Sequence, residues 1–326
     1  MTRLIVKQAG PMMSVQDRGR SGLLQMGVSG CGPMDVTAMR IANRLVGNDE
    51  GDALIEFAHV GGQFEVSEPV LLAVTGGAVS VTIDGTPVAT WESYRLDPGQ
   101  TLRIGALTNA VWGYLALSGG IRTEPVLGAR STHLRSAIGG LEGRRLSAGD
   151  VLPLGATQET ALAAPRKILR KPLSRSAGPI RVIEGPQAGH FDEAAWQQFL
   201  RGPFTVSASR DRMAQMLDGP KITAAAGHDV VSDGTVMGSI QVPASGRPIV
   251  LMAERQTSGG YAKIATVASV DLPRLAQALT GCQIRFKRVS RDHAEDLWIA
   301  HTRALDEVLT SLDHGAGATM SEGGMP

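Results

Sequence analysis

The sequence predicts a mainly β fold with a few helices, a β or α+β protein organised in two lobes. Three observations carry this prediction. The composition, with 40 glycines and 17 prolines beside 43% hydrophobic residues, is typical of short strands joined by many turns. Apolar runs that alternate or stop at turn residues recur along the chain, whereas few segments have helical periodicity. The length of 326 residues suits two domains.

The first lobe is predicted over residues 1–157, as strands with one inserted helix. We expect strands near 3–7, 70–75, 79–83, 101–105 and 111–117, and Asp84-Gly85 predicts a tight hairpin turn after the third of these. The helix begins near Pro33 and Asp35, residues suited to a first turn, and ends at Gly47. Its apolar face consists of Met34, Ala38, Ile41, Ala42 and Leu45.

A basic, proline-containing linker is predicted over 158–178, and the second lobe over 179–313. Its strands are expected near 180–184, 203–207, 228–231, 236–242, 248–253, 262–270 and 284–288. Asp192 is a candidate N-cap, and further helices are expected over 272–279 and 291–312. The glycine-rich tail at 314–326 is predicted to be disordered.

Several function classes are disfavoured by what the sequence lacks. A net charge of +1 gives no reason to expect a nucleic acid or a membrane surface as partner, and no apolar run approaches 18 residues. Cys31 and Cys282 form no CxxC pair, which favours a reducing, cytoplasmic location. The seven histidines have no metal-site spacing, so no metal is expected. GxSxG and GxxxxGK[ST] motifs are also missing.

The segment 238–263 carries the best candidate site. The apolar run at 249–253 predicts a buried strand that ends in a polar loop over 254–263. The loop presents a guanidinium, an amide, hydroxyls and an amine, and two glycines would let its backbone approach a ligand. Such groups suit a small polar substrate and an oxygen that gains negative charge. The alternative is a tight turn with solvated side chains.

Other polar loops occur at 16–22, 130–132, 209–213 and 239–241. If they converge with 255–263, they form a pocket with several cations and no metal, suited to carboxylate, amide or ureido groups. Lys263 is then an acid, a base or an electrostatic anchor, and a salt-bridged structural lysine is the alternative. Cys31 suits a tight turn better than a nucleophile.

Six motifs resemble the biotin-dependent carboxyltransferase family. They are Ser-Val-Gln-Asp-Arg-Gly-Arg at 14–20, Gly-Cys-Gly-Pro-Met-Asp at 30–35, Ala-Asn-Arg-Leu-Val-Gly-Asn at 42–48, Gly-Ala-Arg-Ser-Thr at 128–132, Gly-Ser-Ile-Gln-Val-Pro at 238–243 and Arg-Gln-Thr-Ser-Gly-Gly-Tyr at 255–261. The resemblance covers about residues 3–290, in order. The family includes the C subunit of bacterial 5-oxoprolinase, allophanate-hydrolase subunit 2, an antagonist of a sporulation kinase inhibitor and half of the urea carboxylase carboxyltransferase domain.

The resemblance implies two cyclophilin-like β-barrel lobes and a separately encoded partner. It implies the C subunit of an ATP-dependent 5-oxoprolinase, which converts 5-oxoproline to glutamate with a B-type and an A-type subunit. ATP would be used by the complex and not by this chain. One alternative is half of a urea carboxylase site, with carboxybiotin carried by another protein because this chain has no Met-Lys-Met. The other is a non-catalytic antagonist of a kinase inhibitor.

Roles can be assigned to individual residues under this resemblance. We expect Lys263 and Arg255 to be catalytic. The expected substrate-binding residues are Arg212, Gln241, Gln256, Thr257, Gly259, Gly260, Tyr261, Gln16 and Arg18.

Overall fold

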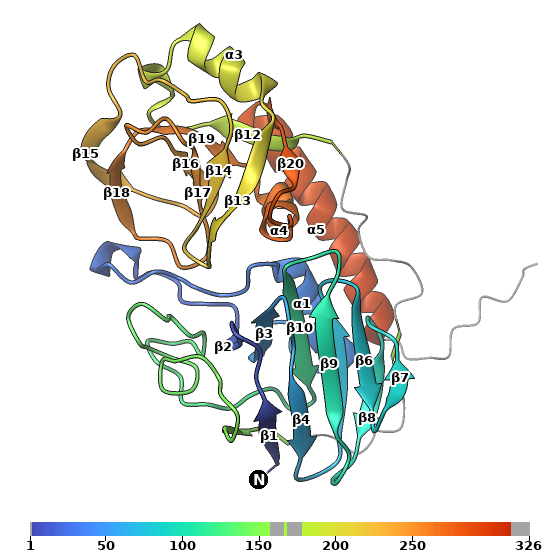
Figure 1. Ribbon diagram of the computed structural model, residues 1–326. Coiled ribbons are helices and arrows are strands. Elements are labelled where there is room, and N and C mark those ends of the chain that lie inside the picture. Colours follow the sequence, from blue (N-terminus) through green and yellow to red (C-terminus); the bar gives the residue numbers. More distant parts are fainter. Residues whose placement is uncertain (1, 157–165, 168–177, 314–326) are drawn as a thin grey trace, which may run out of the picture.

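The computed structural model describes residues 2–156, 166–167 and 178–313. Figure 1 shows two β-rich lobes, the first coloured blue to green and the second yellow to red. Most of the expected linker at 158–178 and all of the expected tail at 314–326 lie outside the described residues. Of the linker, Arg166 contacts the first lobe, where its backbone N–H donates to Ser93 Oγ at 2.7 Å.

The first lobe packs two antiparallel sheets against each other. Its strands are β1 (Arg3–Gln8), β2 (Ser14–Gln16), β3 (Leu54–Ala58), β4 (Gln63–Val66), β5 (Val70–Thr75), β6 (Val79–Ile83), β7 (Thr86–Val88), β8 (Ser93–Leu96), β9 (Leu102–Leu107), β10 (Trp112–Leu117) and β11 (Val151–Pro153). Among the described residues one sheet has the order β11-β1-β4-β9-β6-β7 and the other β2-β3-β10-β5-β8. Alternate residues such as Leu72, Leu115 and Phe64 fill the space between them.

The inserted helix covers the outer face of the second sheet. Helix α1 (Val36–Leu45) begins one residue after Asp35, whose side chain accepts the N–H of Ala38 at 3.0 Å. It contacts β5 and β10 and buries Ile41 and Leu45 against them. The predicted hairpin is also present, because β6 and β7 pair across Asp84 and Gly85, both with positive φ.

The second lobe is a nearly closed barrel. Its strands are β12 (Ile180–Glu184), β13 (Phe204–Arg210), β14 (Ala214–Asp218), β15 (Asp229–Gly234), β16 (Ser239–Gln241), β17 (Ile249–Leu251), β18 (Ser258–Tyr261), β19 (Lys263–Val267), β20 (Gln283–Ile284) and β21 (Phe286–Arg288). Within the described residues the main sheet runs β20-β13-β14-β17-β16-β19-β12-β21. Only Arg285 separates β20 from β21, so one short segment pairs with both edges of this sheet and closes it.

Helices connect the lobes and cap the barrel. They are α3 (Glu193–Arg201), α4 (Leu272–Ala276) and α5 (Arg291–Asp313), with 3-10 turns η1 (Leu24–Met26), η2 (Ala188–His190) and η3 (Ser269–Asp271). Asp192 caps α3 as predicted, accepting the N–H of Ala195 at 2.8 Å. Helix α5 runs from the barrel onto α1 of the first lobe (Figure 1). It buries Leu305 and Leu309 in a core that contains residues of both lobes.

Candidate functional site

A two-stranded ribbon of β15 and β18 lies beside the barrel and organises the candidate site. Asp229 pairs with Tyr261 at one end of the ribbon, and Gly234 pairs with Ser258 at the other. The sequence prediction of a loop throughout 254–263 was therefore wrong for 258–261. Glycines disfavour strands, but pairing with β15 holds this glycine-containing segment in an extended conformation.

Lys263 projects from β19 into a buried position under this ribbon. Its side chain is 1% exposed, and Nζ lies 3.5 Å from Oδ2 of Asp233 on β15. Asp233 approaches Nζ at the outer limit of hydrogen-bond length, and no other acceptor among the described residues bonds it. A buried ammonium is costly unless it is paired and hydrogen-bonded, so this side chain keeps donor capacity for a ligand.

Gln241 provides a second buried donor beside Lys263. The two residues are opposite each other on the antiparallel strands β16 and β19, so their side chains share one face of the sheet. Gln241 Oε1 accepts from Gln256 Nε2 at 3.4 Å, whereas its own Nε2 has no acceptor in the described part of the chain. A Cβ built on Gly259 would lie 2.4 Å from Nε2, which explains the need for glycine there.

Asp233 and Gln187 hold Lys263 from the ribbon side. Gln187 accepts the backbone N–H of Lys263 at 3.3 Å and donates to Asp233 Oδ2 at 3.1 Å. The hydrogen bond from Gln187, a second from the N–H of Gly234 and the charge of Lys263 lower the pKa of Asp233. Asp233 is therefore a half-exposed carboxylate that orients the ammonium without enclosing it.

The other predicted residues of this segment lie along the ribbon. Arg255 is partly buried at its base and donates from Nε to the carbonyl of Thr235 at 3.4 Å. The backbone carbonyl of Thr257 accepts the N–H of Thr235 at 3.0 Å, and the side chain of Thr257 takes no part in this hydrogen bond. Tyr261 is 42% exposed at the ribbon end. Gly260 packs near Val230, where a Cβ would meet the carbonyl oxygen at 3.4 Å.

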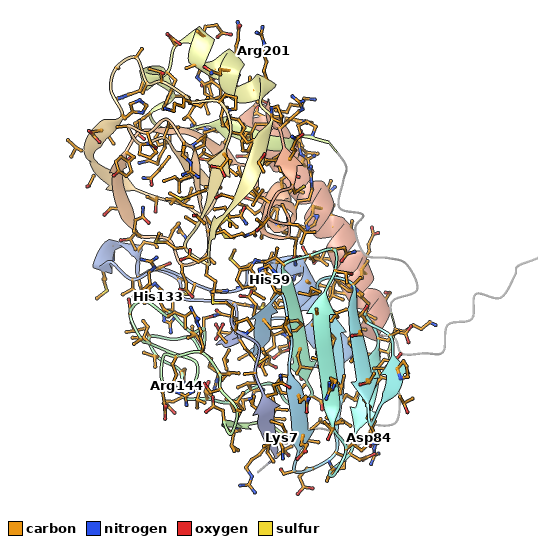
Figure 2. The ribbon with its side chains drawn as sticks, viewed as in Figure 1. Lys7, His59, Asp84, His133, Arg144 and Arg201 are labelled. Atoms are coloured by element: carbon orange, nitrogen blue, oxygen red, sulfur yellow. The ribbon has the colours of Figure 1, made fainter. Side chains whose placement is uncertain are left out.

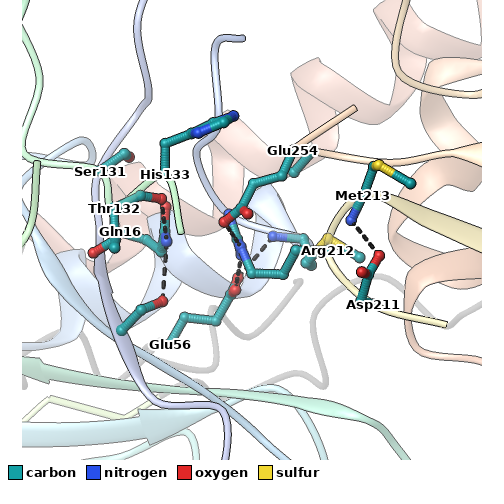
Figure 3. Close-up of polar contacts among 12 residues, drawn as sticks. Gln16, Glu56, Ser131, Thr132, His133, Asp211, Arg212, Met213 and Glu254 are labelled. Carbon is teal, nitrogen blue, oxygen red and sulfur yellow. Dashed lines mark hydrogen bonds and ion pairs between the residues drawn. The ribbon is translucent and has the colours of Figure 1, made fainter. Parts of the chain in front are cut away.

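Arg212 was expected to contact the substrate, but the structure places it in a buried ion cluster. Its side chain is 2% exposed, and the guanidinium donates to Glu254 at 2.7 Å and to Glu56 (Figure 3). It also donates to Gly32 O at 2.6 Å. It also lies over the ring of Trp112, 5.9 Å from the centroid. Burial opposes its charge, but the two carboxylates outweigh this effect and raise its pKa. These contacts assign Arg212 to the junction of the lobes.

A chain of polar groups continues this junction into the first lobe. Glu56 Oε2 accepts from the N–H of Met34 at 2.7 Å and from Tyr114 Oη at 2.9 Å. Tyr114 Oη in turn accepts the N–H of Asp35 at 2.7 Å. Gln277 of the second lobe donates to Asp35 at 3.1 Å and accepts the N–H groups of Val111 and Trp112, where β10 begins. This network of polar groups is hydrogen-bonded in both lobes, so it fixes the relative placement of the lobes.

Gln16 and Arg18 belong to a third group within the first lobe. Gln16 is buried and donates to Ser14 Oγ at 3.0 Å and to Thr132 O at 3.2 Å. Arg18 is exposed, and its side chain lies against the backbone of Gly51. The loops 16–22 and 128–132 do converge, because the carboxylate of Asp17 accepts the N–H groups of Arg130 and Ser131.

The expected single pocket is thus resolved into three polar groups, joined by different hydrogen-bond networks. Sequence reasoning missed Glu56, Asp233 and Gln187. Glu56 had a usable signal, since a carboxylate inside the apolar run 54–58 must find a buried partner. Asp233 and Gln187 had none, because only the fold of the ribbon brings them to Lys263. Within the described residues no cluster of His, Cys, Asp and Glu is suited to a metal ion.

Comparisons with known proteins agree with this architecture. The chain matches a family model, the carboxyltransferase domain, subdomain A and B, over residues 26–288. It is 37% identical to the C subunit of 5-oxoprolinase from Escherichia coli over 295 residues, which is 89% of this chain and 93% of that protein. The crystal structure of TTHA0988 superposes with a TM-score of 0.79 at 36% identity, covering 88% of this chain and 56% of that one.

A further solved structure extends the comparison. Urea amidolyase of K. lactis superposes with a TM-score of 0.85 at 29% identity, covering 94% of this chain and 20% of that one. The chain therefore spans about half of TTHA0988 and about a fifth of urea amidolyase.

The fold and site define a two-lobed β protein with buried hydrogen-bond donors under a ribbon. The chain belongs to the carboxyltransferase domain family and comprises its subdomains A and B. The resemblance inferred from the six motifs is confirmed. Of the helices that the structure describes, none has the length and apolar character required to cross a membrane.

Proposed function

We propose that this chain is the C-type subunit of an ATP-dependent 5-oxoprolinase, which opens the ring of 5-oxoproline to give glutamate. The observation that carries the proposal is similarity over nearly the whole length of both chains to the C subunit of 5-oxoprolinase from Escherichia coli, and a similar match to the Haemophilus influenzae protein at 34% identity. Full-length similarity supports a shared place in an assembly, not only a shared fold.

The Lys263 site supplies groups that suit this chemistry. Opening a lactam places negative charge on the former amide oxygen in the transition state. The ammonium of Lys263 and the amide N–H of Gln241 are buried donors that can stabilise such charge. Arg255 adds a partly buried cation at the base of the ribbon. We assign Asp233 the role of orienting Lys263, because it contacts the ammonium from the solvent side.

Partners and cofactors belong to the same proposal. We propose a B-type subunit that completes the carboxyltransferase unit and an A-type subunit that uses ATP. The spans of about half of TTHA0988 and a fifth of urea amidolyase support a further chain beside this one. We also propose a cytoplasmic location, supported by Cys31 and Cys282, which are free thiols.

The test is ATP-dependent formation of glutamate from 5-oxoproline, with this chain mixed with its B-type and A-type partners and with each left out. We expect activity to require this chain. Lys263→Met should preserve assembly and lower the rate at least about 100-fold, the usual effect of removing one oxyanion donor. Lys287→Met, at an exposed position of β21, is the matched control and should remain active. Full activity of Lys263→Met would contradict the assigned role of this residue.

A second candidate function is carboxyl transfer to urea. The TM-score of 0.85 to urea amidolyase of K. lactis favours it specifically. The same donors, Lys263 and Gln241, suit the oxygens of a carboxyl group that biotin on another protein would deliver. An assembled complex that is inactive on 5-oxoproline but carboxylates urea when a biotinylated protein is added would replace the first proposal by this one.

A further inference from the structure

Arg20 is a buried cation that the Lys263 site does not use. It is 7% exposed, and its Nε donates to the carbonyl of Val126 at 3.0 Å. Nη1 and Nη2 are both buried and have no hydrogen-bond acceptor in residues 2–156, 166–167 and 178–313. A guanidinium stays charged at all physiological pH values, so the fork of Arg20 calls for an acceptor of opposite charge.

The neighbouring carboxylate does not satisfy this fork. Asp17 is occupied by the N–H groups of Gly19 and Ser131, at 2.9 and 3.1 Å, and by Ser131 Oγ at 2.6 Å. Glu254, which lies across the lobe junction, is paired with Arg212 at 2.7 Å. Both nearby acids therefore already have partners.

The loop at 29–31 connects the surroundings of Arg20 with the second lobe. The backbone N–H of Arg20 donates to Gly30 O at 2.7 Å, and Ser29 Oγ donates to Ala253 O at 3.1 Å, so the loop at 29–31 lies between Arg20 and the segment that carries Arg255. The charges of Arg20 and Arg255 both act on the thiol of Cys31 in that loop. Arg255 is partly buried and forms no ion pair with the described residues.

Space around Arg20 is shaped for its planar group. A Cβ built on Gly139 would lie 2.4 Å from Nη2, and Gly139 has a φ of +70°. The backbone at Gly139 therefore lies directly against the guanidinium. Figure 2 shows His133, from the neighbouring turn of this loop, at the side of the first lobe that faces the second.

We propose that the guanidinium fork of Arg20 binds a planar carboxylate in the first lobe, beside the junction of the two lobes. Two parallel N–H groups of one guanidinium match the two oxygens of a carboxylate or carbonate. If the proposed function holds, on which this identification rests, the ligand is the carboxylate of 5-oxoproline. Bicarbonate is the other source of the same chemistry.

The test is calorimetric binding to the full-length chain, alone and in the assembly with its B-type and A-type partners. The probes are 5-oxoproline, bicarbonate and 2-pyrrolidinone, which is the same lactam ring without the carboxylate. We expect 5-oxoproline to bind at least about 10-fold more tightly than 2-pyrrolidinone, because charge-assisted hydrogen bonds contribute about this much or more.

Variants of Arg20 decide whether this residue supplies the site. Arg20→Gln should weaken 5-oxoproline binding by about 10- to 100-fold and leave 2-pyrrolidinone unchanged. Arg20→Lys keeps the charge without the fork and should give a smaller loss; it also serves if Arg20→Gln does not fold. The matched control is Arg145→Gln, which removes an exposed guanidinium and should not change binding.

The outcomes separate this site from the proposed function. Bicarbonate binding that depends on Arg20, without binding of 5-oxoproline, supports the site and removes support from 5-oxoproline as substrate. Equal binding of 5-oxoproline and 2-pyrrolidinone, or no effect of either Arg20 variant, overturns the site even where glutamate formation depends on Lys263. Failure of all three probes with both the chain and the assembly also overturns it.

Discussion

Arg212 and Lys263 are both nearly inaccessible cations, yet their surroundings are opposite. Arg212 is in contact with two carboxylates and a carbonyl, which engage Nε, Nη1 and Nη2. Lys263 has one half-exposed carboxylate at 3.5 Å and no other acceptor for its ammonium in the described residues. The first arrangement is that of a structural residue, and the second leaves capacity for a ligand.

The comparison shows why residue type and burial alone do not identify a site. Arg212 lies within the polar segment 209–213 that suggested substrate binding, but its partners Glu56 and Glu254 come from different lobes. A buried ion pair of this kind contributes little net stability compared with apolar packing, but removing one member leaves unpaired charges. The contacts of Arg212 with Glu56 and Glu254 instead fix how the two lobes are placed relative to each other.

The largest effect is expected from Arg212→Met. It leaves Glu56 and Glu254 buried without their cation, so we expect a loss of about 3–5 kcal/mol in the free energy of unfolding. Urea unfolding of the purified chain measures this loss. Arg95→Met is the control, because the Arg95–Asp97 pair is about half exposed and should contribute less than about 1 kcal/mol. A similar small loss for Arg212→Met would remove the contrast with Lys263.

Much of the fold could be predicted because local patterns agree with it. The hairpin at Asp84-Gly85, the apolar run of β5 and the N-cap Asp192 each depend on neighbours in the chain. Strand β14 was missed because Gln215 interrupts its apolar pattern, although this side chain is buried and donates to Leu275 O at 3.3 Å. The closure of the barrel by β20 and β21 depends on pairing over long sequence distances, which no local pattern encodes.

Part of the candidate site could also be predicted from local patterns in the sequence. Gln241 and Lys263 were expected, and register on adjacent strands brings them together. Arg212 was assigned to the same pocket because its residue type suits anions, while the partner that occupies it, Glu56, is 156 residues away. Residue type shows which bonds a side chain can form, but only tertiary structure shows which are already formed.

A smaller effect is expected from Asp271→Asn, at a pair with an intermediate environment. Burial opposes the charge of Asp271, but hydrogen bonds and charge from Arg181, and the charge of Arg274, lower its pKa below 3.8. Because the folded-state pKa is lowered, its contribution to stability is complete above the unfolded value of about 3.9 and is lost as pH falls through the folded one.

The measurement is the difference in unfolding free energy between the wild type and Asp271→Asn as a function of pH. We expect about 1–3 kcal/mol, constant from pH 7 to about 5 and shrinking below about pH 4. Asp97→Asn, whose carboxylate is 43% exposed, is the control and should give a smaller difference. A difference for Asp271→Asn that grows as the pH falls would contradict the direction of the pKa.

Lys263→Met should change the free energy of unfolding much less than Arg212→Met does. The substitution keeps the length of the side chain and removes an ammonium whose one described acceptor is Asp233, at 3.5 Å. We expect stability to stay within about 1 kcal/mol of the wild type, or to rise, since desolvation of the charge is relieved. Urea unfolding measures it beside the activity assay. A loss above about 2 kcal/mol would make the pair with Asp233 structural, the alternative that the sequence left open.

The smallest effect on the fold, and a sharp test of the junction, is the reactivity of Cys31. Burial is the largest cause that raises the pKa of its thiol to about 12, and the nearby charges of Arg212, Arg20 and Arg255 do not reverse this effect. The thiolate is the reactive form, so alkylation at pH 8 should be at least about 100-fold slower at Cys31 than at exposed Cys282. Peptide mass spectrometry after timed iodoacetamide treatment measures both rates in one sample.

Arg212→Met should accelerate labelling of Cys31 if it loosens the junction, whereas Lys263→Met should leave both rates unchanged. Equal rates at the two cysteines in the wild type would mean that the junction is open in solution, and the contrast between a closed ion cluster and an available ammonium would then lose its basis.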